Sequence, residues 1–261
     1  MKILILQSSG RTNGNTARVV SLVQESLRDT ASRRLEDLQV EVVHLARRAL
    51  EPCRGCRSCF DRGEQTCPSR DDLLSLKARM QEADGLVLAG PVYVNDVNGT
   101  MKTWIDRLAH VCHRPEFAGK TALLVATTAD TPARHALRTM QVALWTWGYR
   151  IAGSAWFKTG ALMTAEEVCA RHGERIRRCA GKLHEEIRTR RFLKPSFLSL
   201  MIFRIQQEGW RRTDPASIDH GYWKDRGWLD RRRTFFFDHR TSPLITGAAR
   251  LVGSIAAAAF L

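Results

Sequence analysis

The sequence predicts an α/β protein whose parallel β-sheet is covered by helices on both faces. Three short, nearly uninterrupted apolar segments indicate buried strands: KILIL at 2–6, GLVLA at 85–89 and KTALLVAT at 120–127. Amphipathic segments with helical spacing separate them, which is typical of strands joined by helical crossovers. A polar loop containing Gly10 and Gly14 follows the first segment, and we expect these glycines to permit tight backbone turns where the strand passes into a helix.

Strands and helices are expected to alternate along the first two thirds of the chain. A helix opened by Asp71 and Asp72 is favoured because carboxylates in a first turn complement the helix dipole. Its inner face is expected to contain Leu73, Leu74, Leu76 and Met80. The full expected order is strand 2–6, helix 14–29, strand 40–45, the Asp71–Asp72 helix, strand 85–89, helix 99–111, strand 120–127, helix 132–147, strand 149–157 and a helix over roughly 164–190.

This pattern ends near residue 190, which predicts a domain over 1–190 and a C-terminal extension over 191–261. Within the extension, helices are expected at 196–208 and 242–261, with irregular chain elsewhere. We expect it to pack on the core or at an oligomer interface, through the aromatic side chains Trp210, Tyr222, Trp223 and Trp228. A substrate pocket lined by these four is the alternative. The apolar end, residues 256–261, is expected to dock on the protein, with a dimer contact or a membrane-interface anchor as alternatives.

The net charge of +14 is concentrated toward the C-terminus. Residues 1–170 carry 22 basic and 18 acidic side chains, a net of +4, whereas residues 171–261 carry 19 and 9, a net of +10. Such a basic region can meet an acidic protein, an anionic membrane surface, a phosphorylated cofactor or nucleic acid, or can simply be a solvated surface. The sequence contains no helix-turn-helix, zinc-finger or RNA-binding signature, so a nucleic-acid partner is not expected.

Neither a signal peptide nor a membrane span is expected. The apolar start is only five residues long, and no stretch reaches the ~18–20 apolar residues that a membrane span needs. We therefore expect a cytoplasmic protein, and membrane-surface contact by the extension is not favoured. In a reducing compartment, clustered cysteines more often bind metal or do redox chemistry than form disulfides.

The loop after the first strand, QSSGRTNGNTARVV, has the composition of an anion site. Small polar side chains and free backbone N–H groups at the start of a helix suit a phosphate. The loop is neither a GxGxxG fingerprint nor a GxxxxGK[ST] loop, which disfavours Rossmann-type dinucleotide binding and nucleotide hydrolysis. An ordinary polar turn with a helix cap is the alternative.

Four of the seven cysteines fall within fifteen residues: Cys53, Cys56, Cys59 and Cys67. Three thiolates at intervals of three, with a fourth before a proline, resemble the ligand spacing of ferredoxin clusters, and we favour a 4Fe-4S cluster. Zinc, or free or redox-active thiols, remain the alternatives. The other cysteines, Cys112, Cys169 and Cys179, lie on helical patterns and are expected in the core. His110 and His113 flank Cys112 but lack a fourth ligand nearby, so a metal site there is not expected.

Three segments together resemble the flavodoxin-like, NAD(P)H-dependent FMN reductases. SSGRTNGNT resembles their SPRxxGNT phosphate loop, although Gly10 stands where proline is usual. AGPVYVNDVNGTMKTWIDR at 89–107 resembles their SPVYxxxxxxxxKxxIDR segment. The cysteine run followed by Asp71 and Asp72 resembles the CxxCxxC…C…DD block of the iron–sulfur flavoprotein branch. The order and spacing agree over about residues 1–185.

The resemblance implies a flavodoxin-like, doubly wound, five-stranded parallel sheet of order 2-1-3-4-5 with FMN at the carboxyl ends of its strands. Carried over by motif, Ser9, Arg11, Asn13, Asn15 and Thr16 would surround the FMN phosphate, and Pro91, Val92, Tyr93, Val94 and Asn95 would line the isoalloxazine. Thr127 and Thr128 would complete the site from the third loop, TTADTPARH, which lacks the glycine pair of many relatives. Lys102, Asp106 and Arg107 are expected to form structural salt bridges.

The expected function is that of an FMN-dependent redox enzyme passing electrons between NAD(P)H or ferredoxin and a small acceptor through FMN and the cluster. The basic last third of the chain would suit an acidic ferredoxin. In such relatives, dimers or tetramers bring the cluster of one subunit near the flavin of another, so a homo-oligomer is expected. The alternatives are a cluster-free NAD(P)H:FMN or quinone reductase, and a non-enzymatic electron carrier or redox sensor.

Overall fold

The computed structural model describes residues 1–260, with the side chain of Phe260 excluded, so the expectation for the tail end at Phe260 and Leu261 lies outside the described residues. Five parallel strands form the sheet in the order β2-β1-β3-β5-β6, and the short β4 pairs antiparallel with the end of β3. The strands are β1 (Lys2–Gln7), β2 (Gln39–His44), β3 (Gly85–Tyr93), β4 (Asp96–Val97), β5 (Thr121–Thr128) and β6 (Arg150–Lys158). The predicted flavodoxin-like order is therefore confirmed, with β4 as an addition that the sequence did not predict.

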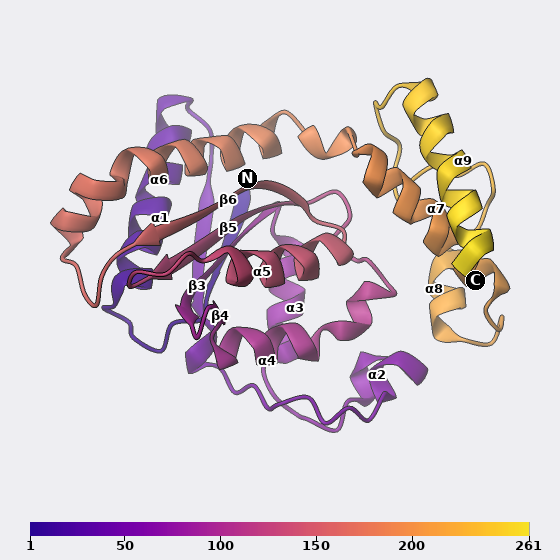
Figure 1. Ribbon diagram of the computed structural model, residues 1–261, viewed down its shortest axis with the longest axis horizontal. Coiled ribbons are helices and arrows are strands. Elements are labelled where there is room, and N and C mark those ends of the chain that lie inside the picture. The colour runs from indigo at the N-terminus through magenta and orange to yellow at the C-terminus, as the bar shows by residue number, and fades with distance from the viewer. Residues whose placement is uncertain (261) are drawn as a thin grey trace.

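Helices cover both faces of this sheet (Figure 1). They are α1 (Asn15–Arg33), α3 (Leu73–Glu82), α4 (Gly99–Arg107), α5 (Arg134–Thr146) and α6 (Ala165–Arg188), while the short α2 (Ser58–Asp61) lies apart from the sheet in the cysteine-rich loop. Side chains of α1 and α6 pack with Ile3 and Ile5, whereas those of α3, α4 and α5 pack with Leu4 and Leu6. Because successive residues of a strand point to opposite faces, KILIL supplies both cores at once.

Short 3-10 helices lie in the connections. They are η1 (Leu45–Arg47), η2 (Glu64–Thr66), η3 (Ala109–Cys112) and η4 (Arg191–Leu193). The predicted helix 99–111 is thus an α-helix that ends at Arg107, followed by η3. The predicted inner face of α3 is correct except for Leu74, whose side chain is 40% exposed.

The extension lies beside the sheet (Figure 1), and its side chains form a hydrophobic core of their own. It contains α7 (Phe197–Arg212), α8 (Ile218–Asp225) and α9 (Pro243–Phe260), of which α8 was not predicted. Trp223 and Trp228 are buried in this core, with Trp210 and Tyr222 partly buried against it. The backbones of α7 and α9 approach closely, since a Cβ on Gly253 would lie 2.7 Å from the carbonyl oxygen of Met201.

The four aromatic side chains pack mainly within the core of the extension, and Trp223 also donates to the carbonyl of His113 in the first domain at 2.8 Å. A cavity of about 250 Å³ lies between the extension and the amino ends of β5 and β6, but Tyr149, Phe192 and Phe236 are among its lining residues, and the four aromatics are not. Among the described residues, no helix combines the length and the apolar character needed to cross a membrane.

Candidate functional site

The loops at the carboxyl edge of the sheet are joined by buried hydrogen bonds. The hydroxyl of Ser8, directly after β1, donates to Oδ1 of Asn98 at 2.6 Å, and Nδ2 of Asn98 donates to the Ser8 carbonyl at 2.8 Å. Gly90 makes this approach possible, because a Cβ there would lie 2.6 Å from the Ser8 hydroxyl. Ser8, Gly90 and Asn98 are thus structural members of the site that the motif comparison did not identify.

A second link joins the start of α1 to the end of β5. The hydroxyls of Thr16 and Thr127 lie 2.7 Å apart, and both residues are buried. Pro91 of β3 is paired in register with Thr127, which brings three of the expected site residues together. The carbonyl of Thr128 accepts from the backbone N–H of Thr159 at 2.9 Å, so β6 continues the same edge.

The loop between β1 and α1 contains both exposed side chains and side chains that are hydrogen-bonded within the protein. Arg11 and Asn13 are exposed, and the buried Ser9 hydroxyl accepts from the backbone N–H of Arg11 at 3.2 Å. α1 begins at Asn15, as expected, after Gly14 at φ −86°. Neither Gly10 nor Gly14 has a left-handed backbone, but Gly14 closes a tight turn in which its N–H donates to the Arg11 carbonyl at 3.4 Å, and a Cβ on Gly14 would lie 3.0 Å from Cβ of Arg11.

Asn15 holds the loop after β6, residues 159–163, in place. Its side-chain amide donates to the carbonyls of Thr159, Gly160 and Ala161 at 3.2–3.4 Å, and its Oδ1 accepts from the N–H of Met163 at 2.9 Å. The 159–163 loop comes from the far end of the domain in sequence. A motif read from residues 8–16 alone could not identify this contact.

The hairpin between β3 and β4 carries an unusual backbone. Val94 and Asn95 have φ of +48° and +65°, and Tyr93 and Val94 are 58% and 100% exposed. A β-branched residue in the left-handed region is strained, and such strain is often found at binding sites. Asp96 fixes the hairpin to α5 by accepting from the Thr139 hydroxyl at 2.9 Å. Pro91 and Val92 are half-buried at its base.

The four clustered cysteines line one cavity of about 90 Å³, together with Arg107 and His110. Gly55, Arg57 and Gly63 have φ of +67°, +61° and +97°, which curls the loop around the cavity. Within residues 1–260 every cysteine is a free thiol. Burial and the nearby Cys53 raise the pKa of the Cys59 thiol, whereas hydrogen bonding to Ser58 lowers the pKa of Cys56.

Arg107, at the end of α4, holds one side of this cavity. Its guanidinium donates to Asp71 at 2.5 and 3.2 Å and to the Glu51 carbonyl at 2.7 Å, and it lies 3.7 Å from Sγ of Cys67. The pair with Asp71 is 3% exposed on both sides. The structural role expected of Lys102 and Asp106, 2.5 Å apart on the surface, fits their positions, but Arg107 also contacts the cysteine site.

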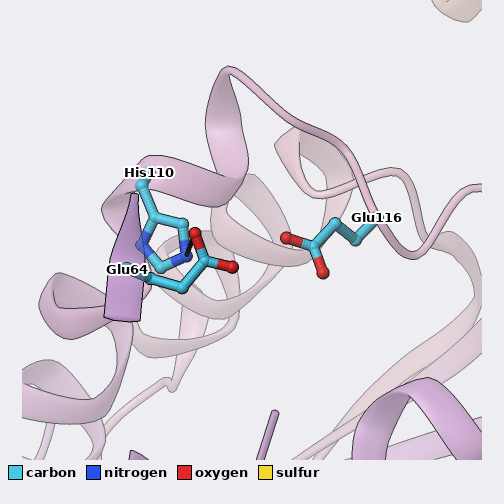
Figure 2. A group of neighbouring side chains, drawn as sticks. All are labelled: Glu64, His110 and Glu116. Carbon is cyan, nitrogen blue, oxygen red and sulfur yellow. Dashed lines mark ion pairs between the residues drawn. The ribbon is translucent and has the colours of Figure 1, made fainter. Parts of the chain in front are cut away.

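A buried ionic cluster lies on another side of the cavity. Lys77 is 2.5 Å from Glu64 and 2.6 Å from Glu116. Nε2 of His110 is 4.0 Å from Glu64 (Figure 2). Arg114 donates to the Cys59 carbonyl at 2.5 Å and lies 3.5 Å from Asp219 of α8. The ligand atoms of Glu64, His110 and Glu116 lie within 4.8 Å of one another. Since the Lys77 ammonium already lies between the two carboxylates, it serves as their cation.

The remaining candidates lie apart from the cavity. Cys112 and Cys179 are partly buried against the two cores, but Cys169 is exposed, so its predicted core position is wrong. His113 lies 2.8 Å from Asp219, and its ring packs edge-on against Phe60 at 4.8 Å. His113 therefore bridges the extension, at Asp219, and the cysteine loop, at Phe60.

The carboxyl-edge loops and the cysteine cavity lie at opposite ends of α4. Asn98, the residue before this helix, is bonded to Ser8, and Arg107, its last residue, lines the cysteine cavity. Nine helical residues span about 13 Å at 1.5 Å per residue.

Comparison with known proteins places this geometry in a family. Residues 1–161 match the model of the NADPH-dependent FMN reductases. An iron–sulfur flavoprotein of Archaeoglobus fulgidus is 29% identical over 238 residues, covering 88% of this chain and 100% of the relative. Another, of Methanocaldococcus jannaschii, is 37% identical over 107 residues, 41% of this chain and 51% of the relative.

A solved structure, that of RosB with bound 8-demethyl-8-formylriboflavin-5'-phosphate, shares the fold with a TM-score of 0.57. It is 17% identical and covers 72% of this chain and 79% of its own. The family match extends over more than half of the 261 residues. The chain therefore belongs to the NADPH-dependent FMN reductase family, as an FMN-dependent oxidoreductase, and within that family it resembles the iron–sulfur flavoproteins.

Proposed function

We propose that this FMN-dependent oxidoreductase carries a 4Fe-4S cluster on its four clustered cysteines and passes electrons between NAD(P)H or ferredoxin and a small acceptor. One observation carries the proposal: Cys53, Cys56, Cys59 and Cys67 line a single cavity at the end of α4 opposite the carboxyl-edge loops. FMN when bound exchanges electrons singly or in pairs, and an iron–sulfur cluster exchanges them singly.

The flavin would lie across the carboxyl edge. Ser9, Arg11, Asn13 and Thr16 would face its phosphate, with the N–H groups at the start of α1 favouring the negative charge. Asn15 would act by fixing the 159–163 loop beside them. The flavin ring would lie along the hairpin, against Pro91, Val92, Tyr93, Val94 and Asn95, with Thr127 and Thr128 at the adjoining strand end.

The cysteine cavity fits a cluster by its donors and its charge. Four thiols suffice for the four irons of a cubane. The buried Arg107 guanidinium, 3.7 Å from Cys67, would offset the negative charge of thiolates and sulfides. Arg54, Arg57 and Arg62 add positive charge on the same loop.

Two exposed surfaces, the arginines of the cysteine loop and the apolar side chains of α9, suit two kinds of partner. The exposed arginines of the cysteine loop would attract an acidic redox protein such as a ferredoxin. A dimer or tetramer would place the cysteine loop of one subunit near the flavin of another. The exposed apolar side chains Leu244, Leu251 and Ile255 of α9, separated by seven and four residues, offer one contact surface for it.

The test is a UV–visible spectrum with iron and sulfide analysis on protein purified without oxygen. About four irons per chain are expected, with broad absorption near 400 nm over the flavin bands. Cys56→Ser should lose both. Cys169→Ser, which removes an exposed thiol outside the cavity, is the matched control and should retain both.

Flavin bands without iron in the wild type would overturn the cluster and favour the cluster-free NAD(P)H:FMN or quinone reductase. Equal loss of iron in both variants would also contradict the assignment of the four ligands. Steady oxidation of NAD(P)H with a quinone separates an enzyme that uses nicotinamide from one that needs a ferredoxin.

A further inference from the structure

The side chain of His110 is fully buried and has an unexplained position. It lies in η3, directly after α4, and lines the same cavity as the four cysteines. Neither of its ring nitrogens has a hydrogen-bond partner among the described residues. An imidazole always carries at least one N–H, and a buried donor left without a partner costs about 1–3 kcal/mol. Native structures seldom leave such a donor unpaired, so a partner is to be sought in the cavity.

The neighbouring ionic groups do not supply this partner. Nε2 of His110 is 4.0 Å from the Glu64 carboxylate, beyond hydrogen-bond distance, and Glu64 is bonded to Lys77 at 2.5 Å. Figure 2 shows one ring nitrogen facing Glu64 and the other turned away from both carboxylates. Burial and the charge of Lys77 lower the pKa of His110 to about 4, so the ring is neutral near pH 7. A neutral imidazole has one nitrogen that donates and one that accepts.

We infer that His110 donates a hydrogen bond to a sulfur of the iron–sulfur group held by the four cysteines. This inference rests on the proposed function, because it needs that group in the cavity. Hydrogen bonds to the sulfurs stabilise the reduced, more negative cluster and so raise its reduction potential. His110 would then be a residue that sets the potential of the cluster, fixed in place by α4 and by the ionic cluster beside it.

The test compares midpoint potentials of the iron–sulfur signal in anaerobically purified protein. His110→Leu removes the donor and should lower the potential by about 59 mV, which is a tenfold change in a one-electron equilibrium. His110→Asn keeps an N–H and should restore part of the difference. His113→Gln is the control, because His113 is bonded to Asp219 and does not line the cavity.

Iron is counted in every variant before its potential is measured. A wild type without iron would overturn the proposed function and this inference together. A wild type with four irons, beside a His110→Leu variant of unchanged iron and potential, would overturn only the role of His110. If His110→Leu loses iron while His110→Asn retains it, the donor is supported, since a purely space-filling role would favour leucine over the smaller asparagine.

Discussion

The loops at the carboxyl edge of the sheet and the cysteine loop are stabilised by different kinds of interaction. The loops at the carboxyl edge are joined by neutral hydrogen bonds, as between Ser8 and Asn98 or between Thr16 and Thr127. The cysteine loop is held by buried charges, with Arg107, Lys77 and Arg114 each paired with carboxylates. Removing one half of a buried ion pair costs far more than removing a neutral hydrogen bond. The cysteine loop is therefore the region where single substitutions should destabilise most.

The largest effect is expected for Arg107→Leu. The substitution leaves Asp71 buried without its partner and the Glu51 carbonyl without its donor, so the free energy of unfolding should fall by about 3–5 kcal/mol. Lys102→Gln on the same helix is the matched control, since its exposed pair with Asp106 contributes about 0.3–0.5 kcal/mol. Urea unfolding of both variants measures the difference. Similar losses in the two would show that burial of the Arg107 pair contributes nothing.

Acid should affect the cysteine loop next. Burial alone would raise the pKa of Glu64, but the hydrogen bond and charge of Lys77 outweigh it and lower the pKa to about 2. The stability from Glu64 is therefore present above pH 4.5 and is lost as the pH falls toward 2. For His110, with its pKa lowered to about 4, the unfolded chain takes up the proton first, so stability is lost as the pH falls from about 6.5 to 4.

Each unit of pKa difference corresponds to about 1.4 kcal/mol at full effect. Unfolding free energies measured from pH 7 to 4 should therefore fall in the wild type and fall less in His110→Asn. The comparison between the two proteins isolates His110 from the other histidines. Parallel profiles would contradict a neutral, buried imidazole in the folded protein.

Asp219→Asn tests whether the extension supports the cysteine loop. Asp219 lies 2.8 Å from His113 and 3.5 Å from Arg114, which bonds to the Cys59 carbonyl. Loss of the carboxylate charge should cost about 1.5–3 kcal/mol and should speed the reaction of the half-buried Cys59 with a thiol reagent in metal-free protein. Asp214→Asn, on the exposed loop before α8, is the control. Equal reactivity of the Cys59 thiol in the two variants would show that Asp219 does not support the cysteine loop.

A smaller effect on stability is expected at the carboxyl edge of the sheet, for Thr127→Val. The substitution keeps the shape but removes the partner of the buried Thr16 hydroxyl, so the free energy of unfolding should fall by about 1–2 kcal/mol. Thr127→Ser keeps the hydroxyl and should lose less. The FMN dissociation constant of each variant shows whether this link also positions the site. A loss as large as that of Arg107→Leu would remove the contrast between the two regions.

The same contrast explains what the sequence could predict. The strands and helices follow from local apolar runs and polar loops, and the strand order and carboxyl-edge residues follow from the resemblance of short local motifs to a known family. The supports of the cysteine loop come from distant segments, such as Asp219, 152 positions beyond Cys67. A charged residue looks the same in sequence whether it is exposed or buried. Only the fold reveals that Lys77 and Arg114 are buried, or that Asn15 bonds to residues 159–163.

The smallest expected change in stability is that of Val94→Gly, which distinguishes strain from function at the hairpin. A left-handed backbone costs an ordinary residue about 1–2 kcal/mol, while glycine loses about 0.5–1 kcal/mol more conformational entropy on folding, so the variant should be slightly stabilised. Leu35→Gly is the matched control, because Leu35 is 97% exposed, has φ +54° and lies in the turn after α1. Both variants should gain similar stability in urea, but only Val94→Gly should bind FMN more weakly, since its side chain is proposed to pack on the flavin ring. Unchanged FMN affinity in Val94→Gly would show that the Val94 side chain takes no part in binding. The backbone of the strained hairpin alone would then have to position the ring.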